Sequence, residues 1–470
     1  MKDCINAQIA MDMESAINCG MNKQAFLKLV DTKKYQIYGR FASAYTEPYA
    51  KLMALKIVNL IVGKYHYINR HTTIASRPIE LMIDPSNACQ LDCPNCVHSS
   101  SPQAKAAKYF ELYWPPGMLS CEQYEKVLHL YGPFAFGAVL YNYGEPLLNP
   151  QTPKYIAMAR QYLLFTLLST NLSLGKIDVD ALVTSGLNHM ILSIDGVTQQ
   201  SYETYRKHGK LDLVFDNLRK LIDTKKKFGL KTPYLVWQFL TFEHNVHEVD
   251  DALELAESMG VDAIHILTPN DVSADDPRCI LARSSKEGYH YFTPYSTLVA
   301  SVSDSSSDLA TGPHIDKLFN ESLVARMRMI GGIDEASRTG PSGCGWLYKN
   351  ISIDGLGRIM PCCDAPSEYR NLVYGDLQDT NNDYWNSPGF VLSRLSLSDK
   401  QAFFRQSPEN APYCGECPSP SEPPHDLWRV AQSLPFLDKE EVIPTMCREW
   451  LTSWRPGRSS GTFMKLWDRL

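Results

Sequence analysis

The chain lacks the long apolar run of a membrane-spanning segment and the positive charge of a nucleic-acid-binding protein. Its most apolar stretch, residues 52–62, is interrupted by Lys56 and Asn59 and is far shorter than the ~20 residues that a spanning helix needs. We interpret it as an amphipathic helix that docks on its own protein, with docking on a membrane surface as the alternative. The formal net charge is −6 and no block of Lys and Arg stands out, so nucleic acid is not an expected partner.

The sequence also lacks a signal-peptide pattern, and its number of cysteines is not even. No apolar run of signal length follows Met1, so we expect a cytoplasmic protein whose thiols are reduced. An odd total of 13 cysteines among 470 residues does not suit a disulfide framework, and metal ligation is the leading explanation for those that cluster. Five scattered cysteines are interpreted as small buried hydrophobes, namely Cys4, Cys19, Cys121, Cys279 and Cys447.

Strand-like and helix-like patterns alternate between residues 77 and 269. The β-rich runs occupy residues 78–84, 137–143, 164–170, 189–195, 233–242 and 263–269. This alternation predicts an α/β fold in which a parallel sheet curls into a partial barrel, with the active groups at the carboxyl ends of the strands. The flanking segments are expected to be a helical N-terminal extension at 1–76, a connector at 270–343, a cysteine-rich domain at 344–420 and a helical tail at 421–470.

Three cysteines follow the first predicted strand in a C-x3-C-x2-C loop, namely Cys89, Cys93 and Cys96. A structural zinc site wants four ligands, and His98 is the one nearby candidate for the fourth. A thioredoxin-type dithiol needs two thiols and leaves Cys89 without a role. Beside these two alternatives, three thiolates on one loop suit an iron–sulfur cubane whose fourth iron has no protein ligand and can bind a cosubstrate.

This loop, at this place after the first strand, resembles the defining motif of the radical S-adenosylmethionine (radical SAM) superfamily. The resemblance covers about residues 77–420 and implies a partial (β/α)6 barrel of the TIM type. It also implies that the three cysteines hold a [4Fe–4S] cluster and that S-adenosylmethionine binds the open iron. Reductive cleavage of this cosubstrate gives a 5′-deoxyadenosyl radical, which abstracts hydrogen from a C–H bond.

Four further positions resemble the cosubstrate-binding residues of the superfamily. Gly-Glu-Pro ends the second strand where the family has Gly-Gly-Glu-Pro, with Tyr143 in place of the first glycine, so Glu145 would accept hydrogen bonds from the methionyl ammonium group. Asn171 and Ser193, at the next two strand ends, would contact the ribose or the carboxylate. Arg206 would bind the methionyl carboxylate. Taken singly, each residue could instead be a turn former, a strand-end cap or a surface charge.

The remaining clustered cysteines lie near the end of the chain. Cys344, Cys362, Cys414 and Cys417 form an acceptable zinc ribbon by themselves. Their spacing, with the intervening Gly-Asp-Leu and Tyr-Trp-Asn-Ser, resembles the SPASM/twitch extension of radical SAM enzymes, which implies an auxiliary [4Fe–4S] cluster held by these four. The full SPASM pattern does not continue after Cys417, which favours the shorter twitch form with one cluster. Cys363 is interpreted as a buried bystander, with a substitute ligand or an acid/base group as alternatives.

An auxiliary cluster can accept an electron from a substrate radical. The main hypothesis is therefore oxidation or epimerisation of a small polar molecule of the sugar or aminocyclitol type, with flavodoxin or ferredoxin as electron donor. The runner-up is a peptide-modifying maturase, which is disfavoured because residues 1–76 show no strand signals for a leader-binding module. The third hypothesis, from another class, is a zinc-stapled binding protein without catalysis.

Overall fold

The computed structural model describes the central part of the chain and several shorter segments. The described residues are 25, 47–94, 96–100, 116–269, 276–293, 344–362, 373–380, 383–398 and 414. The predicted tail at 421–470, most of the extension before residue 47 and much of the connector lie outside them, as do Cys363 and Cys417. The predicted domain boundaries stay predictions.

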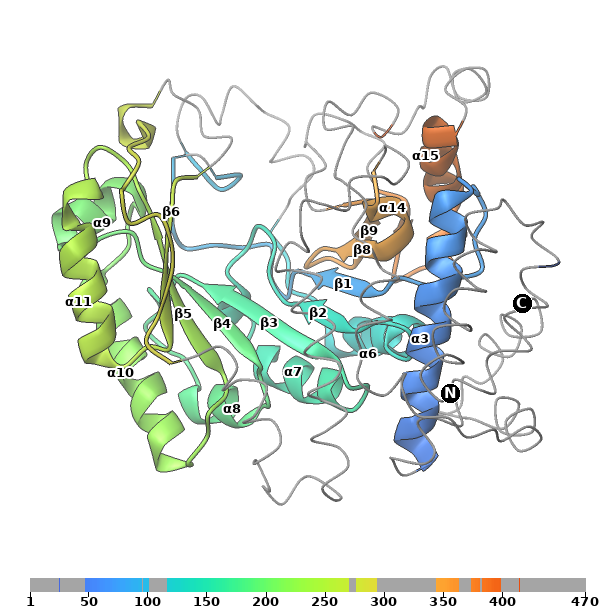
Figure 1. Ribbon diagram of the computed structural model, residues 1–470, viewed down its shortest axis with the longest axis horizontal. Coiled ribbons are helices and arrows are strands. Elements are labelled where there is room, and N and C mark those ends of the chain that lie inside the picture. Colours follow the sequence, from blue (N-terminus) through green and yellow to red (C-terminus); the bar gives the residue numbers. More distant parts are fainter. Residues whose placement is uncertain are drawn as a thin grey trace, which may run out of the picture.

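The described strands form one ten-stranded sheet in the order β10-β9-β8-β1-β2-β3-β4-β5-β6-β7 (Figure 1). The central strands from β8 to β6 are parallel to their neighbours, and the outer pairs are antiparallel. Their bounds are β1 Glu80–Ile83, β2 Gly137–Val139, β3 Phe165–Thr170, β4 His189–Ser193, β5 Tyr234–Leu240, β6 Ala263–Leu267, β7 Gly288–Tyr291, β8 Asn350–Ile353, β9 Arg358–Met360 and β10 Gly375–Asp376. The predicted parallel α/β sheet is confirmed.

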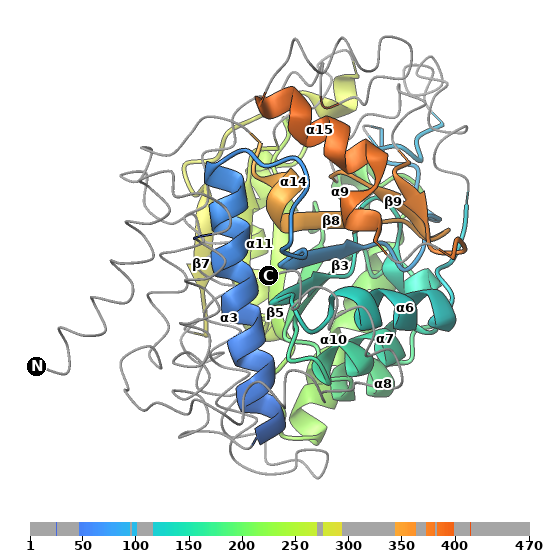
Figure 2. The same cartoon turned by 90° about the vertical axis from the view of Figure 1, so that its right-hand side faces the viewer.

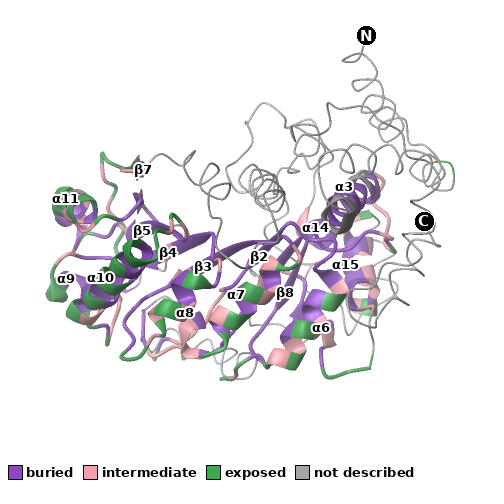
Figure 3. Ribbon diagram, turned by 90° about the horizontal axis from the view of Figure 1, so that it is seen from below, coloured by how far each residue is buried: buried purple, intermediate pink, exposed green. Residues whose placement is uncertain are grey.

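Helices connect the successive strands from β1 to β6 and lie on one face of the sheet (Figure 3). They are α6 Cys121–Tyr131, α7 Thr152–Arg160, α8 Val179–Thr184, α9 Gln199–Tyr205, α10 Leu211–Lys227 and α11 Val249–Met259, with the 3-10 turns η1 Pro146–Leu148 and η2 Val246–Glu248. A third 3-10 turn, η3 Pro277–Cys279, lies between β6 and β7. The buried side chains of these helices share one hydrophobic core with alternate residues of the strands, such as Leu81, Met190 and Trp237. The residues between them, such as Ser193 and Gln238, therefore point to the opposite, concave face.

Strand β8 is the main departure from the predicted architecture. It comes from the cysteine-rich segment, yet it pairs in parallel with β1 and extends the sheet beyond the first strand. The remaining elements of this segment are α14 Trp346–Lys349, η5 Tyr384–Asn386 and α15 Pro388–Ser398. The cysteine-rich segment and the barrel consequently share one backbone hydrogen-bond network.

The apolar stretch at 52–62 lies in α3, Glu47–Ile68, which packs against α14 (Figure 2). The helix docks on its own protein, as predicted. Its two interrupting polar residues, Lys56 and Asn59, are buried. Lys56 Nζ donates to the backbone oxygen of Gly132, the C-cap residue of α6, and to that of Ala135 in the turn that follows. No helix among the described residues has both the length and the apolar character to span a bilayer.

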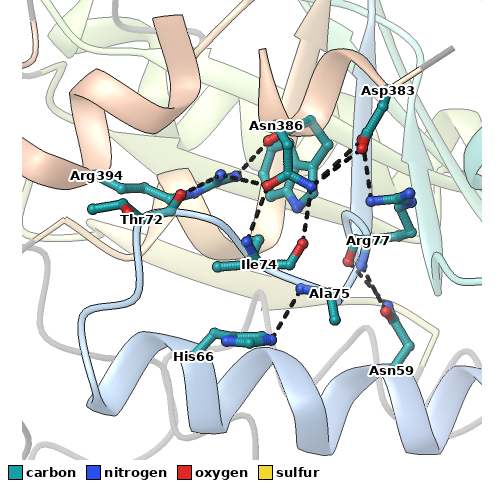
Figure 4. Close-up of polar contacts among 10 residues, drawn as sticks. Asn59, His66, Thr72, Ile74, Ala75, Arg77, Asp383, Asn386 and Arg394 are labelled. Carbon is teal, nitrogen blue, oxygen red and sulfur yellow. Dashed lines mark hydrogen bonds and ion pairs between the residues drawn. The ribbon is translucent and has the colours of Figure 1, made fainter. Parts of the chain in front are cut away.

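The segment 72–77, which leads from α3 into β1, is held by helix α3 on one side (Figure 4). The Asn59 side chain bonds both the N–H and the carbonyl of Arg77, at 2.7 and 3.0 Å. His66 Nε2 accepts a backbone N–H of the segment at 3.0 Å. The guanidinium of Arg77 reaches across to Asp383 in the cysteine-rich segment at 3.3 Å.

The cysteine-rich segment holds the same stretch of chain from the other side (Figure 4). Asn386 bonds both the N–H and the carbonyl of Ile74, at 3.0 and 2.9 Å. Arg394, whose side chain is fully buried, donates to the carbonyl oxygens of Thr72, Leu347 and Trp385. The approach to β1, and with it the start of the cysteine loop, is thus fixed by both N-terminal and C-terminal parts of the chain.

Candidate active site

The cysteine loop begins at Asp84, directly after β1. The buried carboxylate of Asp84 accepts the backbone N–H groups of Asn142, Tyr143 and Gly144 at 3.0–3.2 Å, and burial raises its pKa to about 7. A Cβ atom on Gly144 would lie 1.6 Å from the carbonyl oxygen of Ser86. Only glycine therefore allows the Gly-Glu-Pro loop to approach the cysteine loop this closely.

The three cysteines of the first group meet in a small apolar cluster. Cys93 is buried, while Cys89 and Cys96 pack against the same cluster, which includes Phe242 and Cys279. All three are free thiols. Cys279 is 1% exposed, in keeping with its interpretation as a buried hydrophobe.

The chemistry of this donor set fits an iron–sulfur cluster. Burial raises the pKa of both Cys89 and Cys93 to about 12, so holding them as thiolates requires positive charge beside them. The irons of a cubane supply such charge, and cluster ligation by thiolates is its ordinary mode. Across the described residues, no three His, Cys, Asp or Glu side chains are placed to hold a single metal ion.

Glu145 lies beside these cysteines and is 2% exposed. Its Oε1 accepts Thr170 Oγ1 at 2.7 Å and the N–H of Leu147 at 3.1 Å, and its Oε2 accepts the N–H of Asn171 at 2.9 Å. Burial nevertheless raises its pKa to about 7. A cation bound next to this carboxylate would stabilise its charged form, which fits the predicted contact with an ammonium group.

Asn171 contacts the cysteine loop. Its Nδ2 lies 3.8 Å from Cys89 Sγ, and its Oδ1 accepts Gln90 Nε2 at 2.8 Å and the N–H of Ser173 at 2.9 Å. These contacts support a role in orienting the loop that the sequence did not suggest. The expected contact of Asn171 with the ribose or carboxylate stays a prediction.

Arg206 is largely buried, with its side chain 14% exposed, and forms an ion pair that the sequence analysis did not assign. Its Nε lies 2.5 Å from Asp195 Oδ2. Burial alone would lower the pKa of Arg206, but Asp195 and Cys93 raise it well above its ordinary value, so the guanidinium stays charged beside the cysteines. Ser193 lies on the concave face with its Oγ 3.4 Å from Ser169 Oγ. The binding of cosubstrate by Arg206 and Ser193 stays a prediction.

Asp92, within the loop itself, is a second residue that sequence reasoning missed. It accepts Lys207 Nζ at 3.0 Å and both the N–H and the hydroxyl of Ser100. These bonds outweigh the effect of burial and lower its pKa to about 2. Two features of the sequence could have indicated this ion pair: Asp92 lies between Cys89 and Cys93, and Lys207 follows Arg206.

Three of the four predicted auxiliary cysteines are among the described residues, in the segment that contains the β8–β9 hairpin and α15. Cys344 precedes α14, and Cys362 follows β9. Cys414 Sγ lies 3.7 Å from Tyr374 Oη. Burial raises the pKa of Tyr374 well above its ordinary value, and the charges of Cys414 and Cys362 add to this shift. The structure therefore places one of the four predicted ligands, Cys414, against this tyrosine, while Cys417 is outside the described residues.

The turn of this hairpin touches the cysteine loop directly. The N–H of Gly355 donates to Asn87 Oδ1 at 2.6 Å, and Asn87 Nδ2 donates to Asp354 Oδ2 at 3.2 Å. Asn87 stands two residues before Cys89. A Cβ on Gly355 would lie 2.6 Å from the Asn87 nitrogen, so the close approach needs glycine here. One hairpin thus links the two cysteine-bearing regions.

Family models match both regions of the chain. Residues 83–256 match the radical SAM superfamily, and residues 344–418 match the SPASM iron–sulfur cluster-binding domain. The chain is a radical SAM superfamily enzyme with a C-terminal SPASM domain. The first domain implies a [4Fe–4S] cluster and S-adenosylmethionine, and the second implies auxiliary iron–sulfur clusters. The match is to SPASM, so the expected restriction to one auxiliary cluster stays a prediction.

The individual relatives share less than a quarter of their residues with this chain. The PqqA peptide cyclase of Gluconobacter oxydans is 23% identical over 334 residues, which are 68% of this chain and 80% of that protein. The PqqA peptide cyclase of Methylorubrum populi is 21% identical and covers 67% of this chain and 74% of its own. Among solved structures, Streptococcus suis SuiB bound to S-adenosylmethionine is 13% identical with a TM-score of 0.42 and covers 71% of each chain.

Proposed function

We propose that this radical SAM enzyme modifies a peptide, and that the peptide is its substrate and main partner. The observation that carries the proposal is the similarity to PqqA peptide cyclases, which extends over two thirds of the chain. This reverses the order of the two hypotheses drawn from sequence. The lack of strand signals in residues 1–76 was a weak reason to prefer a sugar or aminocyclitol.

A feature of the sheet edge supports a polypeptide substrate. Strand β7 is the last strand of the sheet, and its Tyr289 and Tyr291 are 49% and 54% exposed. The Tyr289 ring stacks on His265 at 3.8 Å between centroids and on Tyr291 at 5.6 Å. In register with β6, these rings continue the concave face of the barrel. A row of exposed aromatic rings offers contact area for the side chains of an extended peptide.

In this proposal the chain binds and orients, while the bound cofactors supply the radical chemistry. Cys89, Cys93 and Cys96 hold the SAM-binding cluster, and Glu145 accepts the ammonium group of the cosubstrate. When bound, cluster and cosubstrate together supply a carbon radical that can take hydrogen from a C–H bond. Arg206 keeps positive charge beside the thiolates, and the apolar packing around Cys93 keeps water away from the reacting centre.

The remaining cysteines are assigned to the second domain in the same proposal. An auxiliary cluster would be held by Cys344, Cys362, Cys414 and Cys417, and when bound it would supply an acceptor for one electron. The hairpin from Asp354 to Gly357 joins the segment that carries these cysteines to the first cysteine loop. A flavodoxin or ferredoxin would reduce the SAM-binding cluster, and a cytoplasmic location would preserve both clusters.

Deuterium transfer can separate a peptide from a small-molecule substrate. Anaerobically reconstituted enzyme is incubated with dithionite, S-adenosylmethionine and an extract of host cells grown in deuterated medium, and deuterium in 5′-deoxyadenosine is measured by mass spectrometry. We expect transfer from untreated extract and its loss after the extract is digested with a protease that is then inactivated. The Cys93→Ala variant is the control for background cleavage. Transfer that survives digestion would show that the substrate is a small molecule.

A further inference from the structure

The hydroxyl group of Tyr374 lies against a cysteine of the auxiliary site. Its Oη is 3.7 Å from Cys414 Sγ and 2.6 Å from Ser393 Oγ. The cysteine sulfur is a weak acceptor that allows a longer contact than oxygen does. The phenol therefore has a hydroxyl on one side and a sulfur on the other.

Helix α15 fixes the ring of Tyr374. A Cβ atom on Gly389 would lie 2.5 Å from the ring, so the ring occupies the space that glycine leaves open. Phe390 packs against it edge-on, at 5.1 Å between centroids and 85° between planes. Because Gly389 and Ser393 are four residues apart, they share one face of the helix. The ring lies along this face, and its hydroxyl group is brought to Ser393.

The same helix also holds the backbone of the cysteine. Ser396 Oγ lies 3.4 Å from the carbonyl oxygen of Cys414, and its nearer acceptor is the carbonyl oxygen of Ser393 at 2.7 Å. Ser393 and Ser396 are 0% and 2% exposed, which is unusual for serines on a surface helix. Helix α15 thus contacts the Cys414 sulfur through Ser393 and Tyr374, and Ser396 lies close to the Cys414 carbonyl.

We propose that Tyr374 is a positioning residue for the auxiliary iron–sulfur cluster: its hydroxyl donates a hydrogen bond to the Cys414 sulfur and thereby sets the reduction potential of the cluster. A hydrogen bond to a ligand sulfur stabilises the reduced, more negative cluster. Ser393 orients the phenol hydrogen toward the sulfur. The inference rests on the proposed ligation by Cys414, and it is independent of whether the substrate is a peptide.

The test is an EPR-monitored redox titration of the full-length, anaerobically reconstituted protein. The auxiliary cluster is recognised as the signal that does not change when S-adenosylmethionine is added. We expect Tyr374→Phe to shift the auxiliary midpoint potential to a more negative value. Tyr384→Phe is the matched control, because this buried hydroxyl group bonds Lys126 Nζ at 2.7 Å and Asp379 O at 3.2 Å instead of a cysteine.

Three results would overturn the inference. One is an equal midpoint potential in the wild type, Tyr374→Phe and Tyr384→Phe. The second concerns a Tyr374→Phe protein that loses its auxiliary iron. The Ser393→Ala variant, which keeps the phenol, is then titrated instead. An unchanged auxiliary midpoint potential in Ser393→Ala would contradict the proposal. The third is an iron content of the wild-type protein that accounts for one cluster alone, because the proposed ligation of an auxiliary cluster by Cys414 would then be wrong. None of these results affects the deuterium-transfer experiment with protease-treated extract. Failure of the proposed function can therefore be distinguished from failure of this inference.

Discussion

Replacement of Gly144 by alanine should break the contact between the two loops that build the site. The new Cβ atom would lie 1.6 Å from the Ser86 carbonyl oxygen, far inside the 3.0 Å below which such contacts essentially never occur, so one loop must retreat by more than ~1.4 Å. Overpacking of this kind costs about 1–3 kcal/mol. The retreat also strains the three backbone hydrogen bonds to Asp84, each worth about 1 kcal/mol.

We therefore expect Gly144→Ala to lower the free energy of unfolding by about 3 kcal/mol or more and to release iron from the first site. Urea unfolding followed by circular dichroism, together with iron analysis, measures both effects. Gly175→Ala is the matched control, since a Cβ at Gly175 meets nothing within 4 Å, and its effect should stay within about 0.5 kcal/mol. A Gly144→Ala protein with wild-type stability and full iron would refute the described loop contact.

Other perturbations test other parts of the structure. Arg394→Met should lower the free energy of unfolding by about 3 kcal/mol, because the carbonyls of Thr72, Leu347 and Trp385 lose their donors. The control Arg219→Ala, at an exposed ion pair, should change the free energy of unfolding by less than about 0.5 kcal/mol. Urea unfolding measures both values, and equal effects of the two substitutions would contradict this prediction. Asp84 and Glu145 have pKa values raised to about 7, so the folded apoprotein binds more protons than the unfolded chain, and its stability should fall as pH rises from about 4 to about 7. Glu145→Gln should flatten this dependence, and an unchanged slope would contradict the raised pKa.

The sequence predicted those parts of the site that rest on local patterns. The alternation of strands and helices predicted the parallel sheet, and the loop after the first strand predicted the family through the spacing of Cys89, Cys93 and Cys96. Glu145 was recognisable because it follows a strand end and sits in a Gly-Glu-Pro sequence. The predicted second strand, 137–143, was too long: β2 ends at Val139, after which the chain turns to bond Asp84.

Contacts between distant segments were not predictable in the same way. The pairing of β8 with β1 joins segments that are far apart in the chain, and the apolar alternation of Ile351 and Ile353 does not specify a partner strand. Asp195 was visible as a strand-end carboxylate, but its ion pair with Arg206 depends on how α9 returns to the sheet. The role of Gly389 likewise depends on a tyrosine ring from another segment.

The most direct measurement compares S-adenosylmethionine cleavage in two cysteine variants. In the presence of dithionite, Cys93→Ala should form no 5′-deoxyadenosine because the SAM-binding cluster cannot assemble. Cys414→Ala should keep part of this cleavage while forming no modified product, because the first cluster remains and the electron acceptor is lost. Formation of 5′-deoxyadenosine at the wild-type rate by Cys93→Ala would contradict the assignment of the radical-generating site.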